Sequence, residues 1–359
     1  KGERLLLSNV ANKFKPQALK EFLMSPEKLY KWTKMPNFSL SDDEASDLAS
    51  FLLERAQGPK IAEFKADAKI GHKLFRERGC IDCHGGKESS TLSTIPFEQI
   101  KGQQKGCFSR KPKINFGISR KDMEPLRKVF AQKAHSLKNH SPSEFAERQF
   151  KTLNCNACHS RDNAAAKWQN YANEIKDLKT HYKDKGHLDQ SRPQLTFVGE
   201  KIKEGTLKKY LDGSLDYDSR EWLLARMPSF PARAEMMAKS LAYQHAQQGK
   251  KDSLNADKDM IAVGKKLVGT SGFGCIICHD IGKEKAIAAF EVKGVNLKYT
   301  ADRLGKDFYM RWMLNPAHIV PNTKMPKYAD EKGKSPLPDY NNDAAKQFEA
   351  IFEYINTLK

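Results

Sequence analysis

The chain lacks the features of a membrane-spanning or disulfide-framed protein. No run of about 18 apolar residues occurs in its 359 residues, so the sequence predicts no transmembrane helix. No signal-peptide pattern is visible at its start, which leads us to expect a mature chain. Hydrophobic residues make up only 39%, a content that would leave small cores weak if side chains alone filled them. We therefore expect a further component to fill much of each core.

Acidic residues are also in deficit, because 44 Asp and Glu face 62 Lys and Arg, for a formal charge of +18. Zinc-finger, helix-turn-helix and RNA-binding signatures are missing, so we expect no nucleic-acid partner. No strongly amphipathic basic helix with large apolar residues stands out, which leaves a membrane-surface role unsupported. The lysine-rich surface instead predicts an acidic protein partner, with an attraction that salt weakens.

Only seven cysteines are present, and six of them belong to three copies of the pentapeptide CxxCH, at 80–84, 155–159 and 275–279. This spacing is typical of c-type haem attachment. Two thiols one helical turn apart can each form a thioether to a haem vinyl group, and the following imidazole then lies under the iron. The predicted attachment residues are Cys80, Cys83, Cys155, Cys158, Cys275 and Cys278, and the predicted proximal ligands are His84, His159 and His279.

Three motifs together make a zinc or disulfide interpretation unconvincing and predict three covalently attached haem c groups. Haem c is attached outside the cytoplasm, so we expect a periplasmic or otherwise extracytoplasmic protein. If each haem brings two ionised propionates, the formal charge falls to about +12 and the surface stays basic.

A second motif, Met-Pro, also occurs three times, at Met35, Met227 and Met325. Each follows a stretch whose apolar residues have similar offsets and would form one buried helix face. These stretches contain Phe14, Leu19, Phe22 and Leu23; Ile202, Leu207, Tyr210 and Leu211; and Leu304, Tyr309, Trp312 and Met313. The repetition favours axial ligation by the methionines over their use as ordinary core residues.

Helices are predicted on both sides of these motifs. Ahead of each CxxCH, a short apolar pattern carries one small residue, Gly71, Ala146 or Gly264, which would let a second helix cross closely. After the first Met-Pro, Ser41 and Glu44 form a capping box that opens a helix. We expect this helix to bury Leu48, Phe51 and Leu52, and the last helix to bury Ala345, Phe348, Ile351, Phe352 and Ile355.

A helix, CxxCH, a long loop, Met-Pro and a C-terminal helix together resemble the class I cytochrome c fold, over nearly the whole chain. The resemblance implies an all-α protein of tandem cytochrome c-like domains with long haem-binding loops. It also implies the axial pairs His159 with Met227 and His279 with Met325. The predicted parts are a half-module (1–60) that carries Met35, module 1 (61–142), module 2 (143–250) and module 3 (251–359).

Module 1 departs from this pattern. The half-module resembles the C-terminal half of a domain but has no CxxCH before it, and Lys113 stands where module 1 should have its methionine. We favour Met35 as the donated distal ligand of the His84 haem. Cys107 among basic residues, Lys113, Met123, His135, His140 and an open position are the alternatives. Loss of a haem-bearing half, by processing or truncation, would instead leave Met35 without a role.

The resemblance implies electron transfer between an oxidoreductase and another redox carrier, with no catalytic residue in the chain itself. His/Met ligation favours the ferrous state and so a relatively high reduction potential. A haem enzyme, such as a peroxidase or a sulfur-compound dehydrogenase with the His84 haem as active site, is the alternative. The half-module also leaves open that the chain belongs to a larger complex.

Overall fold

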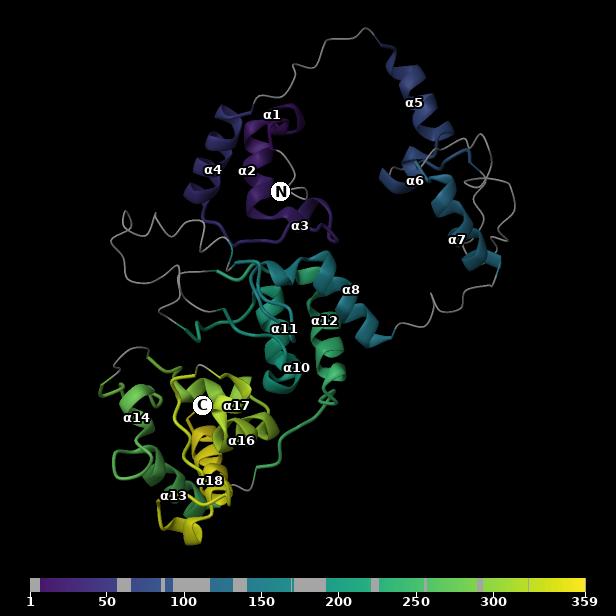
Figure 1. The fold of residues 1–359 in the computed structure, drawn as a ribbon. Coiled ribbons are helices and arrows are strands. Elements are labelled where there is room, and N and C mark those ends of the chain that lie inside the picture. The colour runs from purple at the N-terminus through teal and green to yellow at the C-terminus, as the bar shows by residue number, and fades with distance from the viewer. Residues whose placement is uncertain are drawn as a thin grey trace. The chain divides into compact units, whose positions relative to one another are not determined.

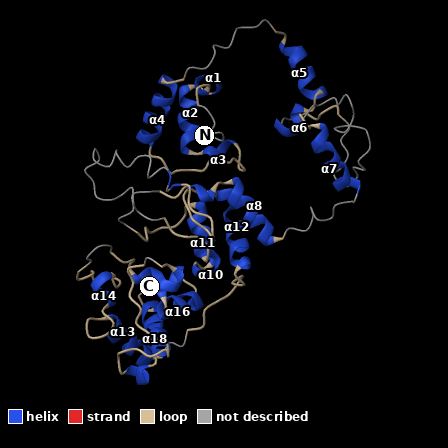
Figure 2. Cartoon of the chain, in the orientation of Figure 1, coloured by secondary structure: helices blue, strands red, loops and turns tan. Residues whose placement is uncertain are grey.

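The computed structural model describes residues 7–56, 66–84, 88–92, 117–131, 141–168, 170, 192–220, 226–254, 257–288, 293–321 and 323–358. The described residues form helices joined by loops and isolated β-bridges, and no strand occurs among them (Figure 2). This confirms the all-α prediction. The identity of the individual domains is not settled by helix content, so the tandem cytochrome-like arrangement stays a prediction.

The chain divides into two compact units. One contains residues 1–56 and 141–359, and the other contains residues 57–140. The larger unit therefore holds the half-module together with modules 2 and 3. The module boundaries within and between these units remain predictions.

A pattern of three helices recurs in the larger unit (Figure 1). A four-residue helix is followed by two linking residues and a nine-residue helix, and a longer helix comes after the Met-Pro. The half-module has α1 (Val10–Lys13), α2 (Pro16–Met24), α3 (Pro26–Leu29) and α4 (Asp42–Glu54). Module 2 has α10 (Val198–Lys201), α11 (Glu204–Asp212) and α12 (Pro231–Gln244). Module 3 has α15 (Thr300–Arg303), α16 (Lys306–Leu314), α17 (Pro316–Ile319) and α18 (Ala344–Asn356).

Each copy of the pattern buries its own apolar face, because residues three and four apart share one side of a helix. Leu19 and Leu23 are buried in α2, Leu207 and Leu211 in α11, and Tyr309 and Met313 in α16, which confirms the predicted offsets. Three separate hydrophobic clusters result, one in the half-module, one in module 2 and one in module 3.

Modules 2 and 3 add a helix that crosses the C-terminal one. The added helices are α8 (Pro142–Thr152), which packs on α12, and α13 (Lys258–Val268), which packs on α18. Gly264 lies so close to α18 that a Cβ atom there would be 2.0 Å from the carbonyl oxygen of Ala350. Ala146 of α8 is fully buried. The predicted use of a small residue at a helix crossing is thus confirmed at Gly264.

Helix α4 begins with the predicted capping box, since Ser41 and Glu44 exchange both hydrogen bonds. Of the residues predicted to be buried, Leu52 packs against the half-module cluster, but the prediction is wrong for Leu48 and Phe51. Ala45 and Ala49 are buried, whereas Leu48 and Phe51 are 41% and 48% exposed. The helical period allows only one of these two faces to meet α2, and the small alanines allow the closer approach. In α18, the predicted face is buried except that Ala344 replaces Ala345.

The smaller unit contains α5 (Ala68–Glu77), α6 (Cys80–His84) and α7 (Arg120–Ala131). Asp67 caps α5 by accepting hydrogen bonds from the backbone N–H groups of Lys69 and Ile70. The first CxxCH follows α5 in the same way that the second follows α8 and the third follows α13.

Candidate functional site

The third CxxCH forms helix α14 (Cys275–Cys278), and His279 follows it. The imidazole Nδ1 of His279 lies 2.7 Å from the carbonyl oxygen of Val295. Because a carbonyl only accepts, Nδ1 must carry the proton, and Nε2 then keeps its lone pair. A Cβ at Gly294 would lie 2.4 Å from the imidazole ring, so only glycine leaves room for it. Burial lowers the pKa of His279, which favours the neutral ring that metal ligation needs.

His159 has the same environment in module 2. Its Nδ1 lies 2.8 Å from the carbonyl oxygen of Pro193, so this ring too is oriented with Nε2 available. Burial is the main cause that lowers the pKa of His159, as it is for His279. Neither carbonyl partner was predicted from the sequence, because they lie 34 and 16 residues after their histidines.

Five of the six motif cysteines have a described side-chain environment, and each is a free thiol: Cys80, Cys155, Cys158, Cys275 and Cys278. Burial raises the pKa of the first thiol in modules 2 and 3, Cys155 and Cys275, to about 11. Without a bound group, such thiols stay protonated near neutral pH. Among the described residues, no group of three or more His, Cys, Asp or Glu side chains gathers as a metal site.

All three motifs begin in the same backbone conformation. The residue directly before the first cysteine is left-handed in each case, with φ of 70° at Gly79, 55° at Asn154 and 71° at Gly274. Glycine and asparagine tolerate this conformation best. The turn starts a tight helical segment that brings both thiols of a motif to one side, α14 in module 3 and the 3₁₀ segment η4 (Cys155–Ala157) in module 2.

Met325 packs within its own module. Its side chain is partly buried against the module 3 cluster, which Cys275 also borders. Tyr328, three residues further on, has its pKa raised to about 12 by burial and by the neighbouring thiols of Cys275 and Cys278. The indole N–H of Trp312 donates to the sulfur of Met325 at 2.8 Å. Tyr328 thus lies near the CxxCH thiols, while the pairing of His279 with Met325 stays a prediction.

Met35 sits on a loop built like that of Met325. In both, the methionine N–H donates to the hydroxyl of a threonine two residues earlier, Thr33 or Thr323, at 3.3 Å. The preceding short helices α3 and α17 each start with proline, after a residue with nearly the same φ and ψ. Met35 packs against the half-module cluster. Its loop therefore has the same construction as the Met325 loop.

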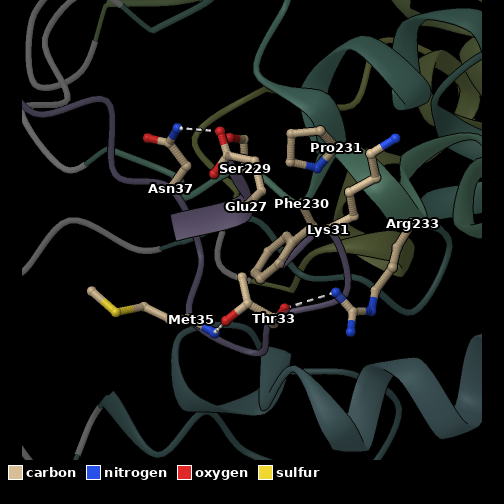
Figure 3. Close-up of a pocket in the computed structure, with 9 residues that line it drawn as sticks. All are labelled: Glu27, Lys31, Thr33, Met35, Asn37, Ser229, Phe230, Pro231 and Arg233. Carbon is tan, nitrogen blue, oxygen red and sulfur yellow. Dashed lines mark hydrogen bonds between the residues drawn. The ribbon is translucent and has the colours of Figure 1, made fainter. Parts of the chain in front are cut away.

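A small pocket lies beside Met35 (Figure 3). Arg233 lines the side of the pocket opposite the Met35 thioether. It donates to the carbonyl oxygens of Trp32 and Thr33 at 2.6 and 2.9 Å. The cavity volume of about 10 Å³ suits a water molecule at most. This pocket lies where the half-module and module 2 meet.

Met227 differs from the other two methionines, because its side chain is 47% exposed. Its Met-Pro loop pairs instead with that of the half-module, since Asn37 and Ser229 exchange two backbone hydrogen bonds of 3.2 and 2.8 Å. Arg226 donates to both carboxylate oxygens of Glu44 at 2.8 and 3.0 Å. The structure thus joins two Met-Pro loops that lie about 190 residues apart, which the sequence analysis did not anticipate.

In the smaller unit, the side chain of His84 is exposed, and the described residues there give it no carbonyl partner like Pro193 or Val295. Of its alternative distal ligands, Met123 is half-buried on α7. The others, Cys107, Lys113, His135 and His140, lie outside the described residues, as does the side chain of Cys83.

No helix among the described residues has both the length and the apolar character needed to cross a bilayer. Searches of protein-family models, curated proteins and solved structures found no match to this chain.

Proposed function

We propose that this chain is a triheme c-type cytochrome that transfers electrons between an oxidoreductase and another redox carrier outside the cytoplasm. The observation that carries the proposal is the orientation of His159 and His279, each of which directly follows a CxxC and holds its Nδ1 on a backbone carbonyl. A histidine fixed in this way presents Nε2 to a metal in one direction only.

The residues have distinct roles in this proposal. Haem c would supply one-electron chemistry at its iron, and the protein would hold and orient it. Cys155 with Cys158, and Cys275 with Cys278, would anchor it through thioethers. Met325, half-buried beside the module 3 cluster, is the distal residue in module 3. Met227 is the proposed distal residue in module 2 and Met35 in module 1.

The charge favours an acidic redox protein or oxidoreductase subunit as partner. A surface with a formal charge of +18, or about +12 with six ionised propionates, attracts such a partner over a Debye length of about 8 Å at physiological salt. The rate of electron exchange should therefore fall as ionic strength rises.

Covalent haem content tests the proposal. The chain should be produced in a host that matures c-type haem. The chain is then denatured, free haem is extracted, and the haem that remains bound to the chain is counted. We expect three haems per chain, and about two in a variant that combines Cys275→Ala with Cys278→Ala. The matched control is Cys107→Ala, the cysteine outside the three motifs, which should keep all three. A wild-type chain without covalent haem would refute the proposal.

Carbon monoxide binding to the fully reduced protein then separates electron carrier from enzyme. If all three haems are six-coordinate, the wild type binds little, whereas Met325→Ala should expose about one haem in three. Met35→Ala tests the donated ligand in the same way. Binding by about one haem in three in the wild type would favour the enzyme interpretation, with an open or weakly ligated haem at His84.

A further inference from the structure

Modules 2 and 3 meet through matching segments. Residues 201–203 and 303–305 pair in antiparallel fashion: the N–H of Lys203 donates to the carbonyl of Arg303 at 2.8 Å, and that of Gly305 to the carbonyl of Lys201 at 3.2 Å. Ile202 and Leu304 form the bridge between them. Since each segment ends a short helix, α10 or α15, the side chains of Lys201 and Arg303 enter the contact from equivalent places in the two modules.

Both positions also have the same spacing from the proximal histidine loop. Lys201 follows Pro193, whose carbonyl orients His159, by eight residues, and Arg303 follows Val295, whose carbonyl orients His279, by eight residues. Lys201 and Arg303 therefore each lie on the segment that follows the carbonyl partner of the histidine in their own module.

A cluster of polar groups forms around this pair. Arg220 joins Lys201 and Arg303, and the three positive charges lie close enough to act on one another. The pKa of Lys201 is lowered to about 8, first by burial and then by the charges of Arg303 and Arg220. Tyr217 lies beside Arg303, and its ring stacks on Tyr299 of module 3 with centroids 4.0 Å apart.

Two polar atoms of this cluster are buried without a hydrogen-bond partner, the hydroxyl of Tyr217 and Nε of Arg303. None of the three cations forms an ion pair with an acid among the described residues. Asp216 and Asp302 are near enough to act on Tyr217, but both are exposed. Nearby Arg311 shows the contrast, because it donates to the carboxylate of Glu200.

Partly buried cations without a counter-charge and buried donors without an acceptor both cost free energy. A carboxylate would remove both costs, because it accepts hydrogen bonds from arginine, lysine and a phenol. The cluster therefore has the chemistry of an anion site that no acidic side chain among the described residues fills.

We propose that Lys201, Arg220, Arg303 and the Tyr217 hydroxyl form one carboxylate site, shared by modules 2 and 3, for the haem propionates of these modules. This inference rests on the proposed function. The equal spacing from the two histidine loops favours propionates over a diffusing anion, because it places each module's cation at the same sequence distance from the proposed haem site of that module. A shared site would couple the two haems electrostatically and make the contact between modules 2 and 3 depend on haem.

Reduction potentials test this site. The variants Lys201→Gln and Arg303→Gln keep the backbone pairing and each remove one charge. Tyr217→Phe removes only the unpartnered hydroxyl. Lys209→Gln removes a charge from an exposed position on α11 and is the matched control. All are titrated spectroelectrochemically as the purified haem-loaded full chain, after their haem content has been counted.

We expect Lys201→Gln and Arg303→Gln to lower the potential of at least one haem by clearly more than Lys209→Gln, because an uncompensated propionate favours the ferric iron. Tyr217→Phe should give a smaller shift in the same direction and serves as the test if a charge variant fails to fold. With three haems present, shifts no larger than that of Lys209→Gln would overturn the inference but not the proposed function. A wild-type chain without haem would overturn the proposed function itself.

Inorganic phosphate distinguishes the source of the anion. At constant ionic strength, added phosphate should leave the wild-type potentials unchanged if propionates fill the site. A phosphate dependence that Arg303→Gln abolishes would show a diffusing anion and overturn the assignment to haem.

Discussion

Helices α13 and α5 each precede a CxxCH motif and each carry one glycine, yet the two glycines have different surroundings. A Cβ at Gly264 would lie 2.0 Å from the carbonyl oxygen of Ala350 and 2.9 Å from Cβ of Tyr354. A Cβ at Gly71 would meet no atom within 4 Å. Both helices start at an aspartate cap, Asp257 or Asp67. The same local pattern therefore builds the helix in both places. Whether the glycine is needed for close packing depends on whether a second helix crosses it.

The sharpest test of this comparison replaces both glycines by alanine. Gly264→Ala should destabilise module 3 by about 3 kcal/mol, because α13 must move away from α18 to admit the methyl group. Gly71→Ala should be neutral or stabilise by about 0.5–1 kcal/mol, since alanine is the better helix former. Denaturant unfolding of the two full-length variants measures the difference. Equal effects at the two positions would show that α5 is as closely packed as α13.

A second prediction concerns the joint between the half-module and module 2. Arg233 is only 6% exposed, and it donates to Gln149 as well as to the carbonyls of Trp32 and Thr33. Arg233→Ala should cost about 2 kcal/mol, because hydrogen bonds from a charged donor are lost and their buried acceptors remain. Arg148→Ala, which removes an exposed pair with Glu144, is the control and should cost less than about 1 kcal/mol.

Protease susceptibility of residues 7–56 adds a second measurement for Arg233→Ala. We expect faster cleavage of the half-module in this variant than in Arg148→Ala. Equal cleavage rates would mean that the half-module does not depend on module 2 for its stability.

The smallest expected effect is at Glu44, on the same joint. Hydrogen bonds from Arg226 and from the backbone N–H of Ser41 hold the pKa of Glu44 at about 2, below its ordinary value of 4.5. A carboxyl whose pKa is lower in the folded state stabilises the protein above about pH 4.5, and this contribution is lost as the pH falls through about 2. Glu44→Gln should remove the part of the acid dependence of the free energy of unfolding that comes from this carboxyl.

Because Glu44 is accessible to solvent, salt should reduce the effect. Carboxyl titration by NMR, compared between the wild type and Arg226→Gln, provides the measurement. A Glu44 pKa that stays at about 2 without Arg226 would contradict this explanation.

Local features were predictable to different degrees. The capping box of α4, the recurring offsets in α2, α11 and α16, and the small residue of α13 are all as predicted. The buried face of α4 was predicted wrongly, because large apolar residues were preferred over Ala45 and Ala49. The left-handed residue before each CxxCH was missed, although Gly79, Asn154 and Gly274 could have indicated it.

The sequence by itself determined the helices, their caps, the tight turns before the cysteines and the CxxCH and Met-Pro motifs, since these depend on residues a few positions apart. The tertiary structure decided which carbonyls orient His159 and His279, which helix crosses Gly264, and that Arg226 meets Glu44 across 182 residues. It also decided that Lys201 and Arg303 share one polar cluster. Contacts of this range leave no periodic trace in a sequence, because they depend on how whole helices pack.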